Sequence, residues 1–286
     1  MKIKFTKMQA FGNDYVYIDA IHQKLDNLSS LAQYVSDRHF AIGSDGMVLI
    51  CPSEAANFRM RMFNPDGSEG EMCGNALRSV GKYVYDHGLI KNNQLTIETL
   101  GGIQKLELFV ENNQAVNIRA DIGEPRLSTK VIPVNTPLEQ FIEQPVTVLD
   151  REFLITAVSW GNPHCVTFLD NVSDFDVHRY GKELEFKRDL FPNKTNVTFA
   201  EIISRDYIKM REWERGTGET IGCGTGCCTA VIAAVLTGRC DRKVTVEQIG
   251  GPLLVEWDEA TNHVFMTGPS HTIFEAEIEV GHIINE

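Results

Sequence analysis

The sequence predicts an α+β protein of two pseudo-symmetric domains, each a mostly antiparallel sheet wrapped around a central helix. Three observations predict this fold class. The chain has 286 residues, more than the roughly 100–200 of a typical single domain. It contains an internal repeat. Within each copy, β-rich and helical stretches are joined by short connections that favour antiparallel neighbours over βαβ crossovers.

The internal repeat consists of three blocks in the same order. GNDYVYID from Gly12 resembles GNPHCVTFLD from Gly161, which lies 149 residues later. RMRMFNPDGSEGEMCGNALRSV from Arg59 resembles KMREWERGTGETIGCGTGCCTA from Lys209, which lies 150 residues later. Between these blocks, DGMV aligns with TNVT at the same spacing of 150 residues. One matched pair would be chance, but three collinear blocks indicate two copies of one fold.

The elements of each copy follow from its periodicity. In the first copy we expect strands near 15–18, 47–51, 58–63, 95–98, 106–110 and 115–118, and helices near 28–38 and 73–87. In the second copy we expect strands near 155–158, 165–169, 197–203, 208–213, 244–248, 253–257 and 263–267, and helices near 177–187 and 223–236. Pro125, Pro133 and Pro137 cluster among polar residues, which predicts a linker at 123–137. The first domain is therefore expected over 1–123, and the second from 124.

Composition excludes several classes of function. Lys and Arg total 27 against 39 Asp and Glu, a net charge of −12, and no basic run could follow a phosphate backbone, so nucleic acid is not expected as a partner. The N-terminus lacks a continuous apolar segment, and the longest weakly polar run, 222–238, is shorter than the ~20 residues that span a bilayer. We therefore expect a cytoplasmic protein with no membrane partner, whose 7 cysteines are reduced.

Two of the cysteines recur at matched positions. Cys73 and Cys223 each follow a glycine-containing turn and begin a predicted helix. Unpaired backbone N–H groups and the helix dipole stabilise a thiolate or a bound carboxylate there. If a pseudo-twofold axis relates the copies, the two thiols face each other across a cleft. One thiolate could then remove a proton from one face of a carbon while the opposite thiol protonates the other, which inverts a stereocentre.

Other uses of the cysteines are weaker. Cys51, Cys165, Cys228 and Cys240 lie in apolar contexts typical of buried hydrophobic residues. Cys223 and Cys227 are spaced for one helix face, but no close cysteine or histidine completes a four-ligand zinc site. The sequence has neither GxGxxG nor GxxxxGK, and no lysine stands out for a pyridoxal Schiff base. We expect no cofactor and no metal.

A set of polar residues lies in the predicted loops around these cysteines. Asparagine amides both donate and accept, an arginine grips a carboxylate in a bidentate manner, and a glutamate accepts from an ammonium. Together they could recognise the zwitterionic head group of an amino acid. The set comprises Asn13, Asn64, Asn162, His164, Asn196, Glu214 and Arg215. For His164 two interpretations stay open, a role beside a thiol or a bond to a buried carbonyl.

At the level of motifs, the chain resembles the diaminopimelate epimerase family of pyridoxal-independent amino-acid racemases. The resemblance rests on FGNDYVYID, IGSDGMVLI, MFNPDGSEGEMCGN, GNPHCV, NVTFAEI and ERGTGETIGCGTG. It implies interconversion of LL- and meso-diaminopimelate for lysine and peptidoglycan precursors, without cofactor or metal. It also implies that about 275–286 completes the first domain, which leaves 124–274 for the second. Ala76, Gly222 and Gly46 depart from the usual pattern of the family.

The resemblance assigns roles to individual residues. Cys73 and Cys223 would be the acid and base, and His164 and Glu214 would modulate the thiols. The reacting carboxylate would be held by the backbone of Gly74, Asn75, Gly224 and Thr225. The non-reacting head group would be held by Asn64, Asn162, Asn196, Glu214 and Arg215, with Asn13 also lining the site.

Two other functions stay open on the sequence. The first is another racemase of the same fold, acting for example on histidine or proline. The second is a thiol-redox protein that uses Cys73 and Cys223 as a switchable disulfide, which the lack of a local CxxC disfavours. The expected partner is a small-molecule amino-acid substrate, and the expected assembly is a homodimer.

Overall fold

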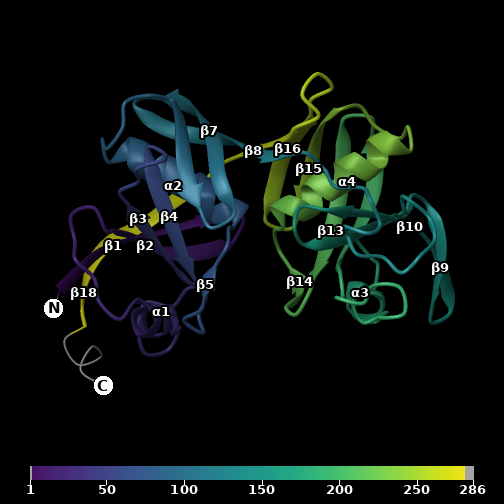
Figure 1. The fold of residues 1–286 in the computed structure, drawn as a ribbon, viewed down its shortest axis with the longest axis horizontal. Helices are drawn as coiled ribbons and strands as arrows, with labels where there is room; N and C mark the ends of the chain where they lie inside the picture. Colours follow the sequence, from purple (N-terminus) through teal and green to yellow (C-terminus); the bar gives the residue numbers. More distant parts are fainter. Residues whose placement is uncertain (1, 281–286) are drawn as a thin grey trace. The chain divides into compact units, whose positions relative to one another are not determined.

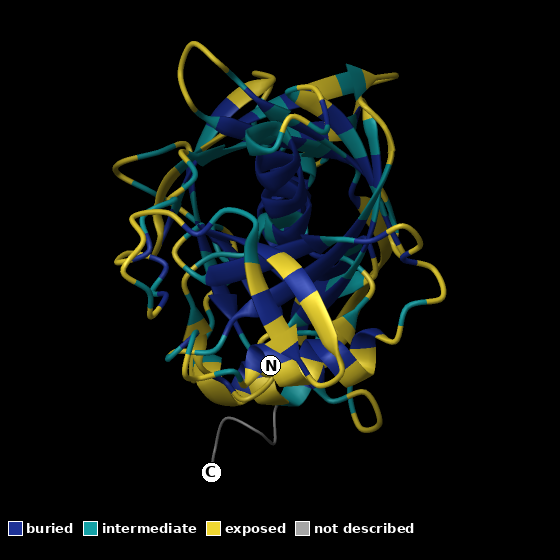
Figure 2. Ribbon diagram, turned by 90° about the vertical axis from the view of Figure 1, so that its right-hand side faces the viewer, coloured by how far each residue is buried: buried dark blue, intermediate teal, exposed yellow. Residues whose placement is uncertain are grey.

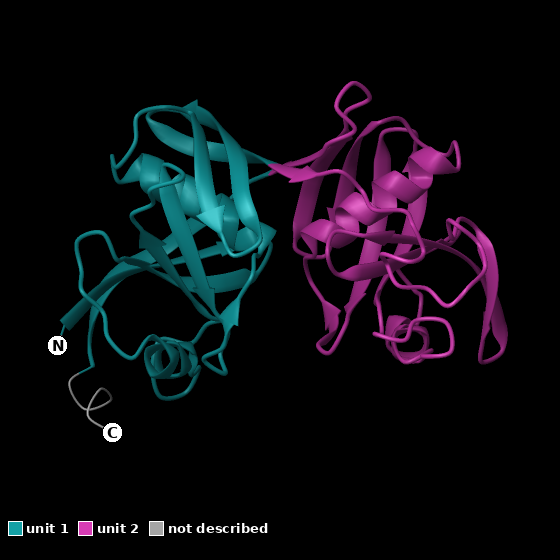
Figure 3. Ribbon diagram, in the orientation of Figure 1, with its two compact units in different colours: residues 1–120, 268–286 teal, residues 121–267 magenta. Residues whose placement is uncertain are grey.

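The computed structural model describes residues 2–280, which divide into two compact units. Unit 1 contains residues 2–120 and 268–280, and unit 2 contains residues 121–267 (Figure 3). The sequence places the boundaries slightly later, at 123 and about 274. The expected extension of the first domain over 281–286 lies outside the described residues. No helix within 2–280 is both long and apolar enough to cross a membrane.

Unit 1 holds the first copy of the repeat (Figure 1). Its elements are β1 (Lys2–Ala10), β2 (Asn13–Asp19), α1 (Leu28–Ser36), β3 (Met47–Cys51), β4 (Phe58–Phe63), β5 (Glu69–Gly70), α2 (Gly74–Asp86), β6 (Gln94–Thr99), β7 (Gly102–Glu111), β8 (Gln114–Gly123) and β18 (His271–Glu279). All but β18 form one continuous run of the chain, which leaves unit 1 through β8.

The elements of unit 2 repeat the order of those from β1 to β8, with one further strand placed first. They are β9 (Gln144–Val148), β10 (Arg151–Ser159), β11 (Pro163–Phe168), α3 (Val177–Glu185), β12 (Asn196–Ser204), β13 (Tyr207–Glu214), β14 (Gly218–Thr220), α4 (Gly224–Leu236), β15 (Lys243–Gln248), β16 (Gly251–Trp257) and β17 (Val264–Gly268). The helices agree with the sequence prediction to within two residues at their starts and ends.

Strand pairing is the same in both units. β1 pairs antiparallel with β2, β2 parallel with β3, and β3 antiparallel with β4. β10, β11, β12 and β13 follow the same sequence of directions. Parallel pairs β4–β6 and β13–β15 then lead into the antiparallel runs β6–β7–β8 and β15–β16–β17. The prediction of two α+β domains with mostly antiparallel sheets is confirmed.

The first strand of each unit has an equivalent partner that comes from a different place in the sequence. In unit 2, β9 pairs antiparallel with β10 from Val148↔Arg151 onward, as the two arms of one hairpin. In unit 1, β18 pairs antiparallel with β1 from Glu279↔Lys2 onward, so the strand opposite β1 comes from the end of the chain. Because β18 pairs along its whole length with β1, the second boundary falls at residue 267 rather than near 274.

The central helix of each unit is buried by the strands around it. α4 is apolar on all sides, and nine of its residues, from Gly226 to Ala234, are buried, as expected of a helix inside a sheet. α2 also buries a continuous run, Asn75 to Gly81, next to its start. Figure 2 shows the dark blue, buried residues gathered on a helix that strands surround. α1 and α3 instead cover separate apolar clusters that contain Leu31 and Leu184.

The sequence did not predict strands β1, β5, β9, β14 and β18. It did predict a linker over 123–137. Part of that segment belongs to the core of unit 2, because Ile132 is fully buried and Val134 is 6% exposed among the side chains around α3. Arg126 also forms a bridge with Ser159 of β10. The prolines therefore interrupt regular structure without freeing the segment from the unit.

Candidate functional site

The two repeated cysteines are both helix N-caps. Cys73 precedes α2 with φ −134° and ψ 122°, and Cys223 precedes α4 with φ −129° and ψ 107°. Each helix begins at a glycine, Gly74 or Gly224, and each has the same length of 13 residues. The repeat therefore places two thiols in one backbone setting, with the unpaired N–H groups of a helix start next to each sulfur.

A short hairpin leads into each of these helices. β4 pairs with β5 before α2, and β13 pairs with β14 before α4. The same ion pair crosses each hairpin, from Arg61 Nε to Glu69 Oε1 at 2.8 Å and from Arg211 Nε to Glu219 Oε1 at 2.7 Å. Each cysteine therefore follows a hairpin with the same turn and the same ion pair, and it occupies the same position relative to that hairpin.

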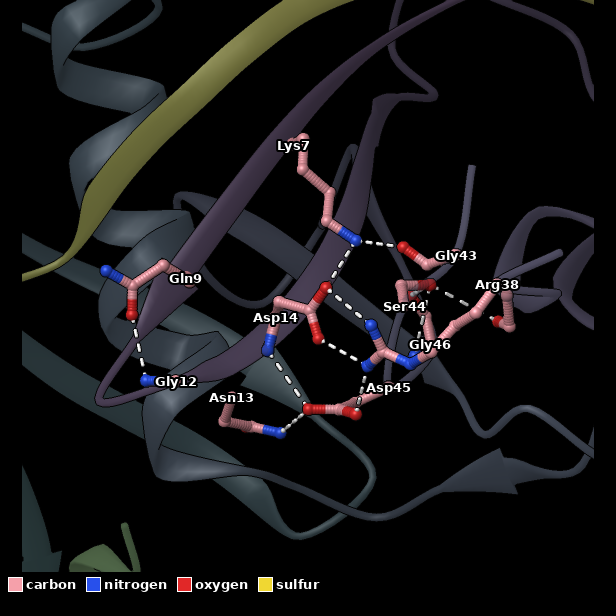
Figure 4. A network of polar contacts seen from close by, with 11 residues as sticks. Lys7, Gln9, Gly12, Asn13, Asp14, Arg38, Gly43, Ser44, Asp45 and Gly46 are labelled. Carbon is pink, nitrogen blue, oxygen red and sulfur yellow. Dashed lines mark hydrogen bonds and ion pairs between the residues drawn. The ribbon is translucent and has the colours of Figure 1, made fainter. Parts of the chain in front are cut away.

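In unit 1 the Cys73 thiol donates to Oδ1 of Asn13 at 3.4 Å. The other end of this amide is fixed, because Asn13 Nδ2 donates to Asp45 Oδ2 at 2.8 Å. Asp45 in turn accepts from Arg38 Nη2 at 2.8 Å (Figure 4). The acceptor beside Cys73 is therefore oriented by a charged network and not by the helix alone.

The network continues from Arg38 to the interior of unit 1. Arg38 Nη2 donates to Asp14 Oδ1 at 2.7 Å, and Lys7 Nζ lies 2.5 Å from Asp14 Oδ2 (Figure 4). The Lys7 side chain is only 6% exposed, and its ammonium also donates to the carbonyl of Gly43. Burial alone would raise the pKa of Asp14, but hydrogen bonds and charges from Arg38 and Lys7 outweigh it and hold that pKa below its ordinary value.

Two further predicted residues of unit 1 lie next to α2 and the hairpin. Asn75 is buried, and its Oδ1 accepts from Nη2 of the fully buried Arg78 at 2.5 Å. Arg78 also lies over the Phe11 ring, 5.3 Å from its centroid. Asn64 Nδ2 donates to Ser68 Oγ at 3.0 Å within the turn between β4 and β5. Both side chains are thus held by neighbours in their own unit.

In unit 2 the Cys223 thiol is 7% exposed. The backbone N–H of Gly226 donates to its sulfur at 3.4 Å, and Thr225 Oγ1 lies at 3.6 Å. Burial raises the pKa of Cys223 well above its ordinary value, and the charges of Glu214 and Glu212 raise it further. The hydrogen bonds from Thr225 and Gly226 oppose this shift without overcoming it.

The remaining predicted residues of unit 2 converge on Asn196. Its Oδ1 accepts the backbone N–H of Arg215 at 2.8 Å, and its Nδ2 donates to the carbonyl of Pro163 at 2.9 Å. His164 Nε2 lies 3.5 Å from the same Nδ2. Glu214, next to Arg215, accepts from Thr220 Oγ1 at 2.6 Å. Asn162 lies in the turn before β11, where its carbonyl accepts the Trp160 N–H at 3.3 Å.

The structure therefore groups the predicted residues by unit. Asn13 contacts Cys73 in unit 1, with Asn64, Gly74 and Asn75 on the adjoining turn and helix start. His164, Asn196 and Arg215 form a chain of contacts in unit 2, and Thr225 contacts Cys223. The His164 ring contacts the side chains of Asn196 and Glu212.

Sequence reasoning missed several polar residues that these contacts involve. Glu212 is 1% exposed on β13, in phase with the buried Ile208 and Met210. A glutamate at a buried position of an alternating strand was the signal available in the sequence. Asp45 and Lys7 gave no comparable signal, because their partners lie on other strands and loops. Among residues 2–280, no group of three or more His, Cys, Asp and Glu side chains could hold a metal ion.

Known proteins resemble this chain over nearly its whole length. The sequence model of diaminopimelate epimerase matches residues 5–128 and 156–273. Proteins named diaminopimelate epimerase from Methanococcus maripaludis and Acetivibrio thermocellus are 51% and 50% identical, covering 97% and 98% of this chain and 100% of each relative.

Solved structures share the fold at low identity. A phenazine biosynthesis protein of the PhzF family from Bacillus anthracis has a TM-score of 0.72 at 20% identity, covering 98% of this chain and 100% of that one. A probable proline racemase from Agrobacterium radiobacter has a TM-score of 0.70 at 12% identity, covering 97% and 93%. The sequence matches are far closer than these structural ones and extend over nearly the whole chain. The chain belongs to the diaminopimelate epimerase family.

Proposed function

We propose that this chain interconverts LL- and meso-diaminopimelate in the synthesis of lysine and peptidoglycan precursors, with Cys73 and Cys223 as its acid and base. Membership of the family and full-length relatives of that name support the activity. One observation carries the assignment of the two cysteines. They are the N-caps of equivalent helices, with nearly equal backbone angles, in the two copies of the repeat.

The reaction needs two groups because it inverts a carbon centre. One thiolate takes the α-proton, and the C–H electron pair stays on the substrate as a carbanion delocalised into the carboxylate. The second thiol gives its proton to the opposite face, which forms the new C–H bond and leaves a thiolate. The two cysteines have then exchanged roles, and the same steps run in reverse. The mechanism requires no oxidant, metal or cofactor.

The helix starts provide the stabilisation that the carbanion needs. Negative charge develops on the carboxylate of the reacting centre as the proton leaves. The free backbone N–H groups at Gly74, Asn75, Gly224 and Thr225 would hold this carboxylate, because helix N-termini favour anions. Glycine at the first position of each helix also removes the Cβ that would keep a ligand away from the backbone.

The second head group of the substrate would bind the polar residues of the set. Arg215 would hold its carboxylate, Glu214 its ammonium, and Asn64, Asn162 and Asn196 the remaining donors and acceptors. Asn13 would line the site beside Cys73, and His164 and Glu214 would modulate the thiols. The chain of contacts from Asn196 to the Arg215 backbone supports this clamp, since it fixes two of its members together.

The raised pKa of Cys223 sets its resting state. Its thiol is protonated at neutral pH in this structure, because burial and the charges of Glu214 and Glu212 disfavour a thiolate. Cys223 is thus ready to donate a proton first, in the direction of reaction in which Cys73 acts as the base. A substrate ammonium that neutralises Glu214 would lower the barrier for the opposite direction.

The proposal is tested with Cys73→Ala and Cys223→Ala. Each should abolish epimerisation with folding intact, because no neighbouring group can replace a thiol on its face of the substrate. Separation of the LL and meso isomers by chromatography measures turnover, and mass spectrometry in D₂O measures incorporation of solvent deuterium. Histidine and proline, offered as alternative substrates, should exchange no α-proton.

Cys51→Ala is the matched control, since Cys51 is a half-buried cysteine at the end of β3 and not a helix N-cap, and it should keep full activity. A Cys73 or Cys223 variant with more than a tenth of the wild-type rate would contradict the two-base assignment. Exchange on histidine or proline but not on diaminopimelate would contradict the substrate.

We propose further that the chain acts in the cytoplasm as a homodimer. None of the seven cysteines forms a disulfide within the described residues, which fits a reducing compartment. β18 exposes Ile273 and Phe274 by 53% and 44%, and such large apolar side chains favour burial against a second copy. Analytical ultracentrifugation of the purified chain tests the assembly, and a monomer at micromolar concentration contradicts it.

A further inference from the structure

One buried carboxylate of unit 2 raises the pKa of Cys223 but binds no part of the substrate in the mechanism above. Glu212 on β13 is 1% exposed, and its Oε2 accepts from Thr198 Oγ1 at 2.6 Å. Its Oε1 has no hydrogen-bond partner within residues 2–280, and neither does Nδ1 of the fully buried His164. These two atoms lie 3.5 Å apart. A buried polar atom without a partner is costly, so their approach to each other needs an explanation.

We propose that Glu212 is a positioning residue. It keeps the ring proton of His164 on Nδ1, and through His164 it orients the Asn196 amide and the backbone of Arg215. The consequence for the substrate rests on the proposed function, in which Asn196 and Arg215 bind the second head group. The consequence for the histidine tautomer does not depend on it.

The directions of the hydrogen bonds between Arg215, Asn196 and His164 support this tautomer. The Arg215 N–H can only donate, so the atom of Asn196 that receives it is Oδ1. The Nδ2 group of Asn196 is then the donor toward the Pro163 carbonyl, and it faces His164 Nε2. A ring nitrogen that faces a donor must be an acceptor, so the proton is on Nδ1 and points at Glu212.

The space around Glu212 is shaped for a carboxylate. Gly226, in the first turn of α4, faces it, and a Cβ built on Gly226 would lie only 2.6 Å from Oε2. The start of α4 therefore approaches the carboxylate as closely as backbone can. A negative charge next to a helix start is favoured by the helix dipole. The Thr198 hydroxyl completes the surroundings by donating to Oε2.

Unit 1 shows that the fold itself does not require the polar contacts that link Glu212, His164, Asn196 and the Arg215 backbone. Strand register identifies the equivalent positions, because Met47↔Phe63 and Val48↔Met62 in unit 1 match Val197↔Trp213 and Thr198↔Glu212 in unit 2. The parallel pairs β2–β3 and β11–β12 extend the match in the same way. The residues of unit 1 equivalent to Asn196, His164, Thr198 and Glu212 are Gly46, Tyr15, Val48 and Met62. The same sheet folds in unit 1 with largely apolar residues at these positions. The polar contacts from Glu212 to Arg215 are therefore specific to the site in unit 2.

The tautomer is measured by nitrogen-15 NMR of protein labelled at the histidine ring nitrogens. Long-range correlations between ring nitrogens and carbon-bound protons distinguish the two neutral tautomers, and the missing signal in His164→Gln assigns the residue. We expect His164 to carry its proton on Nδ1 in the wild-type chain. A proton on Nε2, or on both nitrogens at neutral pH, overturns the proposal.

Glu212→Gln tests the cause at nearly constant volume. The Gln carbonyl still accepts from Thr198, so its NH₂ faces His164 and forces Nδ1 to become the acceptor. The ring proton then moves to Nε2, where it meets the Asn196 NH₂. The Asn196 amide must rotate and lose its bond to the Arg215 N–H. We expect the Nε2–H tautomer and a KM for diaminopimelate raised about tenfold, the size of one buried hydrogen bond left unmade, with a smaller change in kcat.

Glu247→Gln is the matched control, because Glu247 lies on the neighbouring β15, where it accepts from the partly buried Tyr207 hydroxyl and lies 3.9 Å from Lys209 Nζ. It should change neither the His164 tautomer nor KM. A Glu212→Gln chain that keeps the Nδ1–H tautomer overturns the proposal. A changed tautomer with unchanged KM supports the effect on His164 and contradicts the clamp of the proposed function. If Glu212→Gln does not fold, the wild-type spectrum still decides.

Discussion

The two thiol sites share a backbone but differ in what surrounds the sulfur. In unit 1 Cys73 donates to Asn13, whose amide is oriented by Asp45, and Arg38 ties Asp45 to other charges on partly exposed loops. In unit 2 Cys223 is buried beside two glutamates, and the nearby polar groups form a chain inside the sheet. Ion pairs at the surface orient the polar group beside Cys73. Buried hydrogen bonds orient the polar groups near Cys223.

The difference shows how a repeat can diverge. Strand register, hairpin ion pairs and helix caps are the same in both copies, so the position of each thiol follows from the shared fold. The surroundings of each thiol depend on a few inward positions, such as Met62 against Glu212 and Gly46 against Asn196. The two copies therefore surround equivalent thiols with different polar groups.

The largest loss of stability is expected at Gly46 of unit 1, which has no side chain at the position equivalent to Asn196. Gly46 has φ +151°, and a Cβ there would lie 2.3 Å from the Phe63 carbonyl oxygen and 2.8 Å from the Tyr15 ring. Gly46→Ala should lower the free energy of unfolding by about 3 kcal/mol or more, through backbone strain and overpacking. Chemical denaturation followed by circular dichroism measures this loss.

Gly88→Ala separates the two causes, because Gly88 also has a positive φ of +71° but open space around its Cα. It should cost only the strain, about 1 kcal/mol. Equal losses for both variants would mean that the close approach of Phe63 and Tyr15 to Gly46 contributes nothing.

The second prediction concerns the ionic network of unit 1. Asp14→Asn should lower the free energy of unfolding by about 2–4 kcal/mol, because the buried ammonium of Lys7 loses its charge partner. Adding Lys7→Met should recover part of this loss, since the unpaired charge is then removed. A double variant no more stable than Asp14→Asn would contradict a direct interaction between the two residues.

The same pair predicts a dependence on pH. The pKa of Asp14 in the folded chain lies below its ordinary value of 3.8, so its contribution to stability is complete above 3.8. That contribution is lost as the pH falls through the lower folded pKa. The stability difference between wild type and Asp14→Asn should therefore shrink under acid conditions. A difference that stays constant down to pH 2 would contradict the assignment.

The smallest effect compares the matched hairpin ion pairs. Arg61→Ala should cost less than about 1 kcal/mol of unfolding free energy, since the pair with Glu69 is partly exposed. Arg211→Ala should cost about 2 kcal/mol, because Arg211 Nη1 also donates to the carbonyls of Val172, Ser173 and Phe175. Thermal denaturation of the two variants measures the difference, and equal costs would show that these extra bonds add nothing.

Much of the fold was predictable because the repeat carried it. The offset of 149 or 150 residues, fixed by motifs around Cys73 and Cys223, predicted two α+β domains and all four helices. Strands β1 and β18 were not predicted, because each pairs with a segment from the other end of the sequence and β18 is exposed along most of its length. The packing of Ile132 and Val134 was hidden by the prolines around them.

For the site, the sequence predicted a set of polar residues around the cysteines, of which Asn13 contacts Cys73 and Thr225 contacts Cys223, but it did not predict what orients them. The motifs predicted Asn13 and Asn196, and the structure shows that Asp45 and the Arg215 backbone fix their amides. Asp45 and Glu212 act through side chains brought together by strand pairing. Such contacts depend on register across strands, which one sequence without its structure does not specify.

The pairing of β18 with β1 has a consequence for the connectivity of the chain. It reproduces the β9–β10 pairing, except that a turn at Leu149 and Asp150 joins β9 to β10, whereas the paired Lys2 of β1 and Glu279 of β18 lie far apart in the sequence. If a linker joined Glu279 to Lys2 and the chain were opened between Leu149 and Asp150, every strand pairing would remain. A closed chain opened at either of these two connections would keep the same pairs of strands. A circularly permuted gene that begins at Asp150 would encode the same set of contacts in the opposite order of units.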